Sequence, residues 1–149
     1  GGNTISTCEQ TWALIFALMR HTCPADAVMH QGGWDRSKFV GTQLAGKTLG
    51  VIGLGRIGRE VAKRALAMEM KVSVYDPYVS ADAIKAAGCT PVTNLEQGLA
   101  QADFLTLHCP KTPETVGLIA APLLSQLPPG AGLVQVGAGD RNITSAALA

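Results

Sequence analysis

Three glycines with the spacing G-x-G-x-x-G, Gly53, Gly55 and Gly58, directly follow an apolar run from Thr48 to Ile52. The residues from Arg59 onward have the pattern of a helix, so the motif predicts a turn from a strand into a helix. In such a turn the first glycine allows a tight bend, the second lets a ligand approach the main chain, and the third lets the helix pack against the strand. The free N–H groups and positive dipole end of the helix then favour a pyrophosphate. The motif therefore predicts a phosphate site built from the main chain.

The same glycine spacing occurs in protein kinases, where a second strand carrying a lysine follows the loop. Here a predicted helix follows, which favours a dinucleotide site over a kinase loop.

Asp76 provides the second indication of a dinucleotide. It ends a predicted short strand, residues 71–75, and stands eighteen positions after Gly58. An acid about twenty residues after the glycine turn binds the adenosine ribose in dinucleotide folds. Taken alone, Asp76 is more simply read as a turn former before Pro77, but the order of strand, turn, helix, strand and acid favours the ribose site. A carboxylate repels a 2′-phosphate, and the next three residues carry no cation, so the predicted cofactor is NAD rather than NADP.

A second loop, His108 to Pro113, follows a predicted strand at 103–107. In doubly wound sheets the ligand crevice lies beyond the carboxyl ends of the strands, which places this loop beside the glycine turn. Thr112 could offer a hydroxyl to the cofactor, and the prolines stiffen the loop. For His108 the favoured interpretation is a capping or packing histidine.

Short apolar segments alternate with helical ones from Thr48 onward, which predicts a parallel sheet with right-handed crossovers. We expect a doubly wound α/β fold of the Rossmann type, incomplete at its C-terminal side. The predicted strands lie near 48–53, 71–75, 90–92, 103–107 and 131–136. The predicted helices lie near 56–69, 81–87, 94–101 and 121–127, with a capping box at Asn94–Gln97.

The first 47 residues precede this alternation. Residues 6–9 (Ser-Thr-Cys-Glu) have the form of a capping box and predict a helix from Thr7 to about His21. Pro24 predicts the start of a second helix that ends at Gly32-Gly33, followed by a loop over 34–47 with a turn at Ala45-Gly46. The expected buried face of the first helix consists of Trp12, Ile15, Phe16 and Met19.

Composition limits the function classes. The 149 residues are enough for one domain, and 47% hydrophobic with 15% charged residues suits a sheet buried on both faces. A net charge of +1 without a basic stripe argues against nucleic acid. No apolar stretch approaches the ~20 residues of a membrane span, and no signal segment opens the chain. Because the four cysteines (Cys8, Cys23, Cys89 and Cys109) form no C-x-x-C, we expect no metal site, no disulfide and a cytoplasmic protein.

The segment from Gly41 to Val61 (GTQLAGKTLGVIGLGRIGREV) resembles the cofactor domain of the D-2-hydroxyacid dehydrogenase family, most closely its phosphoglycerate dehydrogenase branch. The opening Gly-Asn-Thr-Ile-Ser, the Tyr75-Asp76-Pro77 end of the second strand and the Leu107–Pro110 segment resemble the same family. The similarity extends over essentially residues 1–136.

The resemblance implies an enzyme that oxidises a 2-hydroxy acid phosphate with NAD, as the first committed step toward serine. It places Arg56 and Ile57 against the pyrophosphate, Asp76 against the ribose and Cys109-Pro110 at the adenine side. It also implies a homodimer formed through the helix after Ser6 and the 34–47 segment. We therefore divide the chain into a dimer segment (1–47) and a truncated NAD-binding domain (48–149), with the substrate domain absent. The predicted cofactor-binding residues are Gly53, Gly55, Arg56, Ile57, Gly58, Asp76, Pro77, His108, Cys109, Pro110 and Thr112.

The chain departs from the family after the fifth predicted strand. The family reads Val-Asn-x-Ala-Arg-Gly-Gly there, and its arginine holds the substrate carboxylate. In this chain that position falls on Ala138 or Gly139, Gln135 replaces the asparagine, and Arg141 stands nearby beside Asp140.

The family's acidic residue and catalytic histidine follow later in its sequence, so we assign no catalytic residue, and none of His21, His30 and His108 is given that role. Three interpretations stay open: an NAD-binding portion of a phosphoglycerate dehydrogenase-like oxidoreductase, inactive alone; a non-catalytic NAD-sensing or scaffold module; or a portion of a different hydroxyacid dehydrogenase. Because the strand at 131–136 would form an open edge, we expect 137–149 to be poorly ordered or held by a partner chain.

Overall fold

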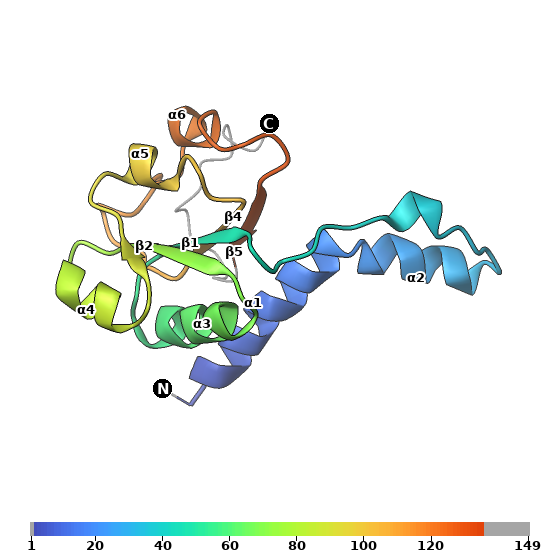
Figure 1. Cartoon of the computed structure of the whole chain (residues 1–149), viewed down its shortest axis with the longest axis horizontal. Coiled ribbons are helices and arrows are strands. Elements are labelled where there is room, and N and C mark those ends of the chain that lie inside the picture. The colour runs from blue at the N-terminus through green and yellow to red at the C-terminus, as the bar shows by residue number, and fades with distance from the viewer. Residues whose placement is uncertain (1, 136–149) are drawn as a thin grey trace.

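The computed structural model describes residues 2–135 and contains one five-stranded parallel sheet (Figure 1). Its order is β3-β2-β1-β4-β5, so the chain winds outward from β1 in both directions. This is the doubly wound topology, with its switch point between β1 and β4. The strands are β1 (Thr48–Ile52), β2 (Lys71–Tyr75), β3 (Thr90–Pro91), β4 (Phe104–Leu107) and β5 (Gly132–Gln135).

The register brings the carboxyl ends of four strands to one edge of the sheet. Ile52 of β1 pairs with Tyr75 of β2 and with Leu107 of β4, and Leu107 in turn pairs with Gln135 of β5. The loops after β1, β2 and β4 therefore leave the sheet side by side. This is the edge of the sheet at which the sequence predicts the ligand crevice.

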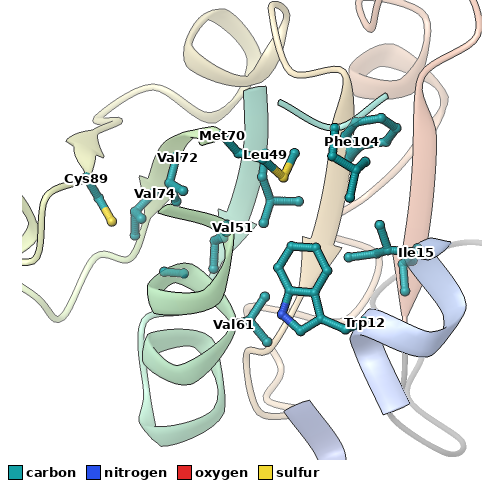
Figure 2. Packing of buried hydrophobic residues seen from close by; sticks show 14 of the residues in the cluster. Trp12, Ile15, Leu49, Val51, Val61, Met70, Val72, Val74, Cys89 and Phe104 are labelled. Atoms are coloured by element: carbon teal, nitrogen blue, oxygen red, sulfur yellow. The ribbon is translucent and has the colours of Figure 1, made fainter. Parts of the chain in front are cut away.

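Helices cover both faces of the sheet, because side chains of successive strand residues point to opposite sides. One core cluster joins α1, α3 and α4 to residues such as Leu49 and Val51 of β1 (Figure 2). The other cluster joins α5 and α6 to Leu105 and Leu107 of β4. The helices are α1 (Thr4–Met19), α2 (Thr22–His30), α3 (Arg56–Ala67), α4 (Ala81–Ala86), α5 (Leu95–Leu99) and α6 (Ala121–Leu124).

The start predicted for α1 is wrong. The helix begins at Thr4, and the Ser6 hydroxyl, which lies inside it, donates a hydrogen bond to the Asn3 carbonyl at 3.1 Å. The capping box expected at Ser6–Glu9 therefore does not form, since its residues already belong to the helix. A serine near a helix start can bond to the preceding turn as well as cap the next one, and the sequence pattern does not distinguish the two.

The buried face of α1 is also rotated from the predicted one. Phe16, expected to be buried, is 41% exposed, whereas Cys8 and Thr11 are fully buried. Thr11 can be buried because its hydroxyl donates to the Thr7 carbonyl at 2.9 Å. The other three predicted core residues, Trp12, Ile15 and Met19, are buried as expected.

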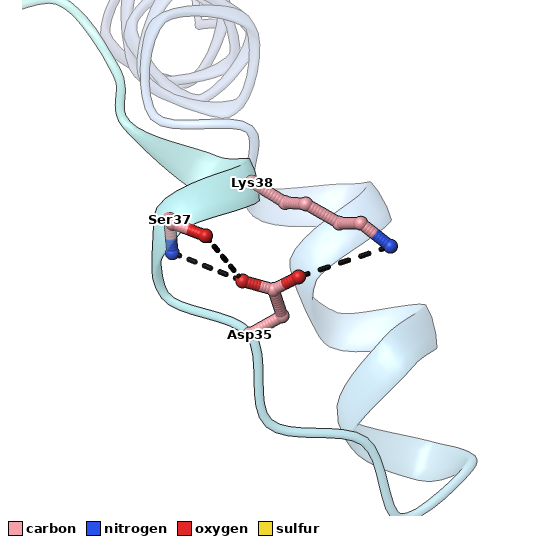
Figure 3. A network of polar contacts seen from close by, with 3 residues as sticks. All are labelled: Asp35, Ser37 and Lys38. Carbon is pink, nitrogen blue, oxygen red and sulfur yellow. Dashed lines mark hydrogen bonds and ion pairs between the residues drawn. The ribbon is translucent and has the colours of Figure 1, made fainter.

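The segment after α1 forms an arm that extends away from the sheet (Figure 1). It contains α2, none of whose residues is buried, and a short 3-10 helix, Ser37–Phe39, inside the predicted loop. Figure 3 shows how Asp35 organises that turn: one carboxylate oxygen accepts from the Ser37 hydroxyl at 2.7 Å, and the other lies 3.8 Å from Lys38 Nζ. The Ser37 hydrogen bond holds the pKa of Asp35 below its ordinary value.

From β1 onward the predicted elements are all present, and each described end coincides with the predicted one or lies up to three residues inside it. α2 begins at Thr22, two residues before Pro24, and the turn at Ala45-Gly46 forms. The Asn94 side chain caps α5 by accepting from the Gln97 N–H at 2.9 Å. α1 packs into the same core as the sheet, while the predicted domain division at residue 47 stays a prediction. The prediction for 137–149 concerns residues outside the described range.

Candidate functional site

Gly53 brings the loop after β1 into contact with the loop after β4. Its φ is +92°, a conformation that favours glycine, and its N–H donates to the Tyr75 carbonyl at 2.9 Å. A Cβ added at this position would lie 2.8 Å from the Cys109 nitrogen and 2.9 Å from the His108 carbonyl carbon. The absence of a side chain at Gly53 therefore allows the two loops to touch.

The other two glycines of the motif differ in the space around them: Gly58 is tightly packed and Gly55 is not. A Cβ on Gly58 would overlap the Gly53 carbonyl oxygen and would lie 3.6 Å from a Val51 methyl carbon. A Cβ on Gly55 would have no protein atom within 4 Å. Gly58 thus allows α3 to pack closely on β1 and its turn, as predicted, whereas Gly55 leaves open space over the main chain.

The first turn of α3 lies next to that open space. The Arg59 N–H makes the first hydrogen bond of the helix, to the Gly55 carbonyl at 3.0 Å. The preceding N–H groups, those of Arg56, Ile57 and Gly58, have no acceptor within the helix. Together with the positive end of the helix dipole, they provide an arrangement that suits a pyrophosphate.

Asp76 connects the end of β2 to the glycine turn. One carboxylate oxygen accepts from the Leu54 N–H at 2.7 Å, and the other accepts from the Tyr78 N–H at 2.9 Å. The bond from Tyr78 stabilises the turn after β2, as the sequence interpretation of Asp76 as a turn former allowed. The bond from Leu54 places the carboxylate at the glycine turn. A carboxylate oxygen can accept more than one hydrogen bond, so each oxygen of Asp76 could still accept one from a ligand hydroxyl.

A cavity of about 200 Å³ lies between these loops. Eight of the eleven predicted cofactor-binding residues line it: Gly53, Gly55, Asp76, Pro77, His108, Cys109, Pro110 and Thr112. The other three, Arg56, Ile57 and Gly58, begin α3 beside it. Six lining residues were not predicted: Ile52, Tyr75, Tyr78, Glu114, Thr115 and Leu118. Tyr75 and Tyr78 flank Asp76 and could have been inferred, but the last three reach the cavity only because their loop folds back.

A larger cavity, about 440 Å³, lies at the opposite edge of the sheet among residues that include His21, Lys47 and Asp103. Lys47 and Asp103 directly precede β1 and β4, so this cavity lies at the amino ends of the strands, whereas doubly wound sheets bind ligands beyond the carboxyl ends. The smaller cavity is therefore the candidate site. Within residues 2–135, no group of three or more His, Cys, Asp or Glu side chains is placed to hold a metal ion.

The Thr112 hydroxyl, predicted to contact the cofactor, already has protein partners. Its oxygen lies 3.3 Å from Thr115 Oγ1. It also bonds to Glu114 and thereby lowers the pKa of that exposed carboxyl. Contact between Thr112 and the cofactor stays a prediction.

The imidazole ring of His108 is neutral near pH 7 and is hydrogen-bonded within the protein. Its Nε2 lies 3.0 Å from the hydroxyl oxygen of Thr106, which is fully buried. Burial lowers the pKa of His108 to about 4. Both observations support the interpretation of a packing histidine.

The depressed pKa of His108 predicts a loss of stability in acid. Well above pH 6.5 the ring is neutral in the folded and the unfolded chain, so it does not change the free energy of unfolding. As the pH falls from 6.5 toward 4, the unfolded chain binds a proton at this ring and the folded chain does not. The free energy of unfolding should fall by roughly 3 kcal/mol through this group, at about 1.4 kcal/mol per pKa unit. Urea unfolding at pH 7 and pH 4.5 should show a larger loss for the wild type than for His108→Gln. Equal losses in the two proteins would contradict this assignment.

Gln135, at the family's asparagine position, lies at the carboxyl end of β5 opposite Leu107. The altered positions after it, Ala138, Gly139, Asp140 and Arg141, lie outside the described residues.

Comparison with known proteins gives consistent matches. The family model for the NAD-binding domain of D-isomer specific 2-hydroxyacid dehydrogenases matches residues 12–149. The D-3-phosphoglycerate dehydrogenases of Synechocystis sp. and Archaeoglobus fulgidus are 44% and 45% identical to this chain, over 93% of its length in each case. The matches cover 25% and 26% of those two proteins, so the chain spans about a quarter of their length.

Solved structures show the same architecture. The apo D-lactate dehydrogenase from Escherichia coli has a TM-score of 0.90 at 28% identity, covering 98% of this chain and 45% of that one. A phosphoglycerate oxidoreductase from Vibrio cholerae has a TM-score of 0.89 at 27% identity, covering 97% and 46%.

Proposed function

Because this chain belongs to the D-isomer specific 2-hydroxyacid dehydrogenase family, whose NAD-binding domain it carries, we propose that it holds the cofactor in a phosphoglycerate dehydrogenase. The proposed reaction is NAD-dependent oxidation of a 2-hydroxy acid phosphate on the route to serine, in the cytoplasm. The observation that carries the proposal is the cavity at the switch point, where open space above Gly55 adjoins the Asp76 carboxylate.

In this proposal each side of the cavity has a separate role. The N–H groups of Arg56 and Ile57 bind the pyrophosphate, and the Asp76 carboxylate accepts hydrogen bonds from the adenosine ribose. Pro77, Cys109 and Pro110 form walls of the adenine side. Bound NAD supplies the hydride acceptor, and these residues hold and orient it.

No residue of the described range is assigned as the proton acceptor for the substrate hydroxyl. His108 is bonded to Thr106 and has a pKa of about 4, too low for an efficient base near neutral pH. His21 lines the cavity at the opposite edge of the sheet, and His30 is exposed on the arm beside Asp26.

The charge of the cavity supports selection of NAD over NADP. Asp76 and Glu114 line it, and its described lining contains no lysine or arginine. A 2′-phosphate would therefore meet two carboxylates and no cation. We expect calorimetry of the wild-type chain to give at least about tenfold tighter binding of NAD than of NADP, a difference of ~1.4 kcal/mol.

Asp76→Asn tests that selection directly. The amide removes the charge and one of the two acceptors, so NAD binding should weaken while the preference over NADP shrinks. Glu9→Gln, far from the cavity on α1, is the matched control and should leave both affinities unchanged. Equal affinities of the wild type for the two dinucleotides would refute the proposed role of Asp76, and no binding of NAD at millimolar concentration would refute the site itself.

The alternative function is a non-catalytic NAD-sensing or scaffold module. The departure from the family sequence over 135–142 favours it, while both interpretations need the same cofactor turn. Mixing the chain with NAD and 3-phosphoglycerate tests the alternative in one direction: formation of NADH by the chain would reject the non-catalytic module and would also contradict our finding no proton acceptor in the described range. We expect no NADH from the 149 residues alone.

We further propose that the chain forms a homodimer through α1 and the arm. The arm exposes large apolar side chains, with Trp34 75% and Val40 76% exposed, and α1 exposes Leu14 and Leu18. In such a dimer these large apolar side chains would be covered rather than exposed to water. None of the helices within the described residues has the length and hydrophobicity that a membrane crossing requires.

A further inference from the structure

Thr115 ties together the loop that follows β4. Its hydroxyl oxygen accepts a hydrogen bond from the Thr112 N–H at 2.7 Å, and the hydroxyl donates to the Pro110 carbonyl at 2.7 Å. The main chain reinforces this turn, because the Thr115 and Val116 N–H groups both donate to the Thr112 carbonyl, at 3.1 and 3.0 Å. One side chain thus bonds to the main chain of two residues that line the cavity.

The same residue is joined to the hydrophobic core on its other side. The Leu118 N–H donates to the Thr115 carbonyl at 3.1 Å, and the next residue, Ile119, is fully buried. Ile119 packs in the cluster that contains Leu105 and Leu107 of β4. A continuous path therefore leads from the core, through Thr115, to Pro110 and Thr112 at the cavity wall.

We propose that Thr115 is a positioning residue that holds Pro110 and Thr112 in place as the wall of the adenosine side of the NAD site. This inference rests on the proposed function of that cavity. Thr115 acts by ordering the loop before the cofactor arrives. Without its hydroxyl, binding must also order the loop, and that conformational cost reduces affinity.

Thr115→Val and Thr115→Ser separate the hydroxyl from the methyl group. Valine has nearly the same shape without the hydroxyl, and serine keeps the hydroxyl without the methyl. By calorimetry, Thr115→Val should bind NAD and ADP-ribose about fivefold to tenfold more weakly, the scale of one lost hydrogen bond. Thr115→Ser should bind both within about twofold of the wild type, which is the scatter of a neutral surface change.

Amide hydrogen exchange gives a second readout that does not depend on binding. In Thr115→Val the Thr112 amide should exchange faster, while Leu105 and Leu107 in β4 keep their protection. The wild-type titration tests the proposed cavity, and only the comparison of the variants tests Thr115. Unchanged NAD affinity in Thr115→Val, or a serine variant as weak as the valine variant, would overturn the inference. Loss of protection throughout β4 would overturn it too, since the effect would then be global.

Discussion

The Gly55→Trp variant is expected to fold like the unsubstituted chain and to bind NAD at least about 100-fold more weakly, a loss of ~2.7 kcal/mol. A Cβ at this position meets no protein atom within 4 Å, and the φ of −72° is accessible to any residue. The indole therefore enters the space that the pyrophosphate needs, without displacing the protein. Calorimetric titration with NAD and thermal unfolding of the same samples measure the two effects separately.

Gly55→Ala is the graded control for this substitution. A single methyl group should weaken NAD binding less than tryptophan does, and both variants should unfold within a few degrees of the wild type. If Gly55→Trp bound NAD normally, the pyrophosphate would not pass over Gly55 and the proposed site would be wrong. If the variant unfolded instead, the open space above Gly55 would not exist in solution.

The Gly58→Ala variant is expected to lose roughly 2–3 kcal/mol of folding free energy, the upper part of the range for an overpacked core. Its Cβ would overlap the Gly53 carbonyl oxygen, which belongs to main chain and cannot rotate away as a side chain could. α3 must therefore move away from β1 and its turn. For a chain of this size the unfolding temperature should fall by about 4–12 °C, at 2–4 °C per kcal/mol.

Gly58→Ala and Gly55→Ala form a matched pair, since both add one methyl group within three residues of the same turn. We expect Gly58→Ala to lower stability and, through the shifted helix start, NAD affinity as well, whereas Gly55→Ala lowers affinity alone. Urea unfolding of the two variants checks this difference. Equal stability of the pair would show that the close contact between Gly58 and Gly53 does not constrain the fold.

Local patterns in the sequence were sufficient to predict the parallel sheet and to place two of its loops, the glycine turn and residues 108–113, at the carboxyl ends of strands. Each apolar strand and amphipathic helix from Thr48 onward carries its own periodicity, and the order of strand, glycine turn, helix, strand and Asp76 favours a dinucleotide fold. The errors in the start and the buried face of α1 arise where one sequence pattern allows two local structures. Ser6 could begin a helix or lie within one, and Phe16 could lie on either side of the boundary of a buried face.

The contacts that complete the candidate site could not be predicted in this way. The Asp76 carboxylate reaches the Leu54 N–H, Gly53 packs against Cys109, and Thr115 returns to Pro110. The first two pairs involve residues far apart in the chain, and the third depends on how one loop folds on the core. The hydrophobic periodicity of a sequence carries no information about contacts between such loops.

The order of residues alone established an NAD-binding doubly wound fold, because main-chain phosphate sites need particular residue types at particular short spacings. The tertiary structure decided which side chains share one cavity and that His108 is neutral and bonded to Thr106. Those properties arise from burial and from contacts across strands, which exist only after the sheet has brought distant loops together.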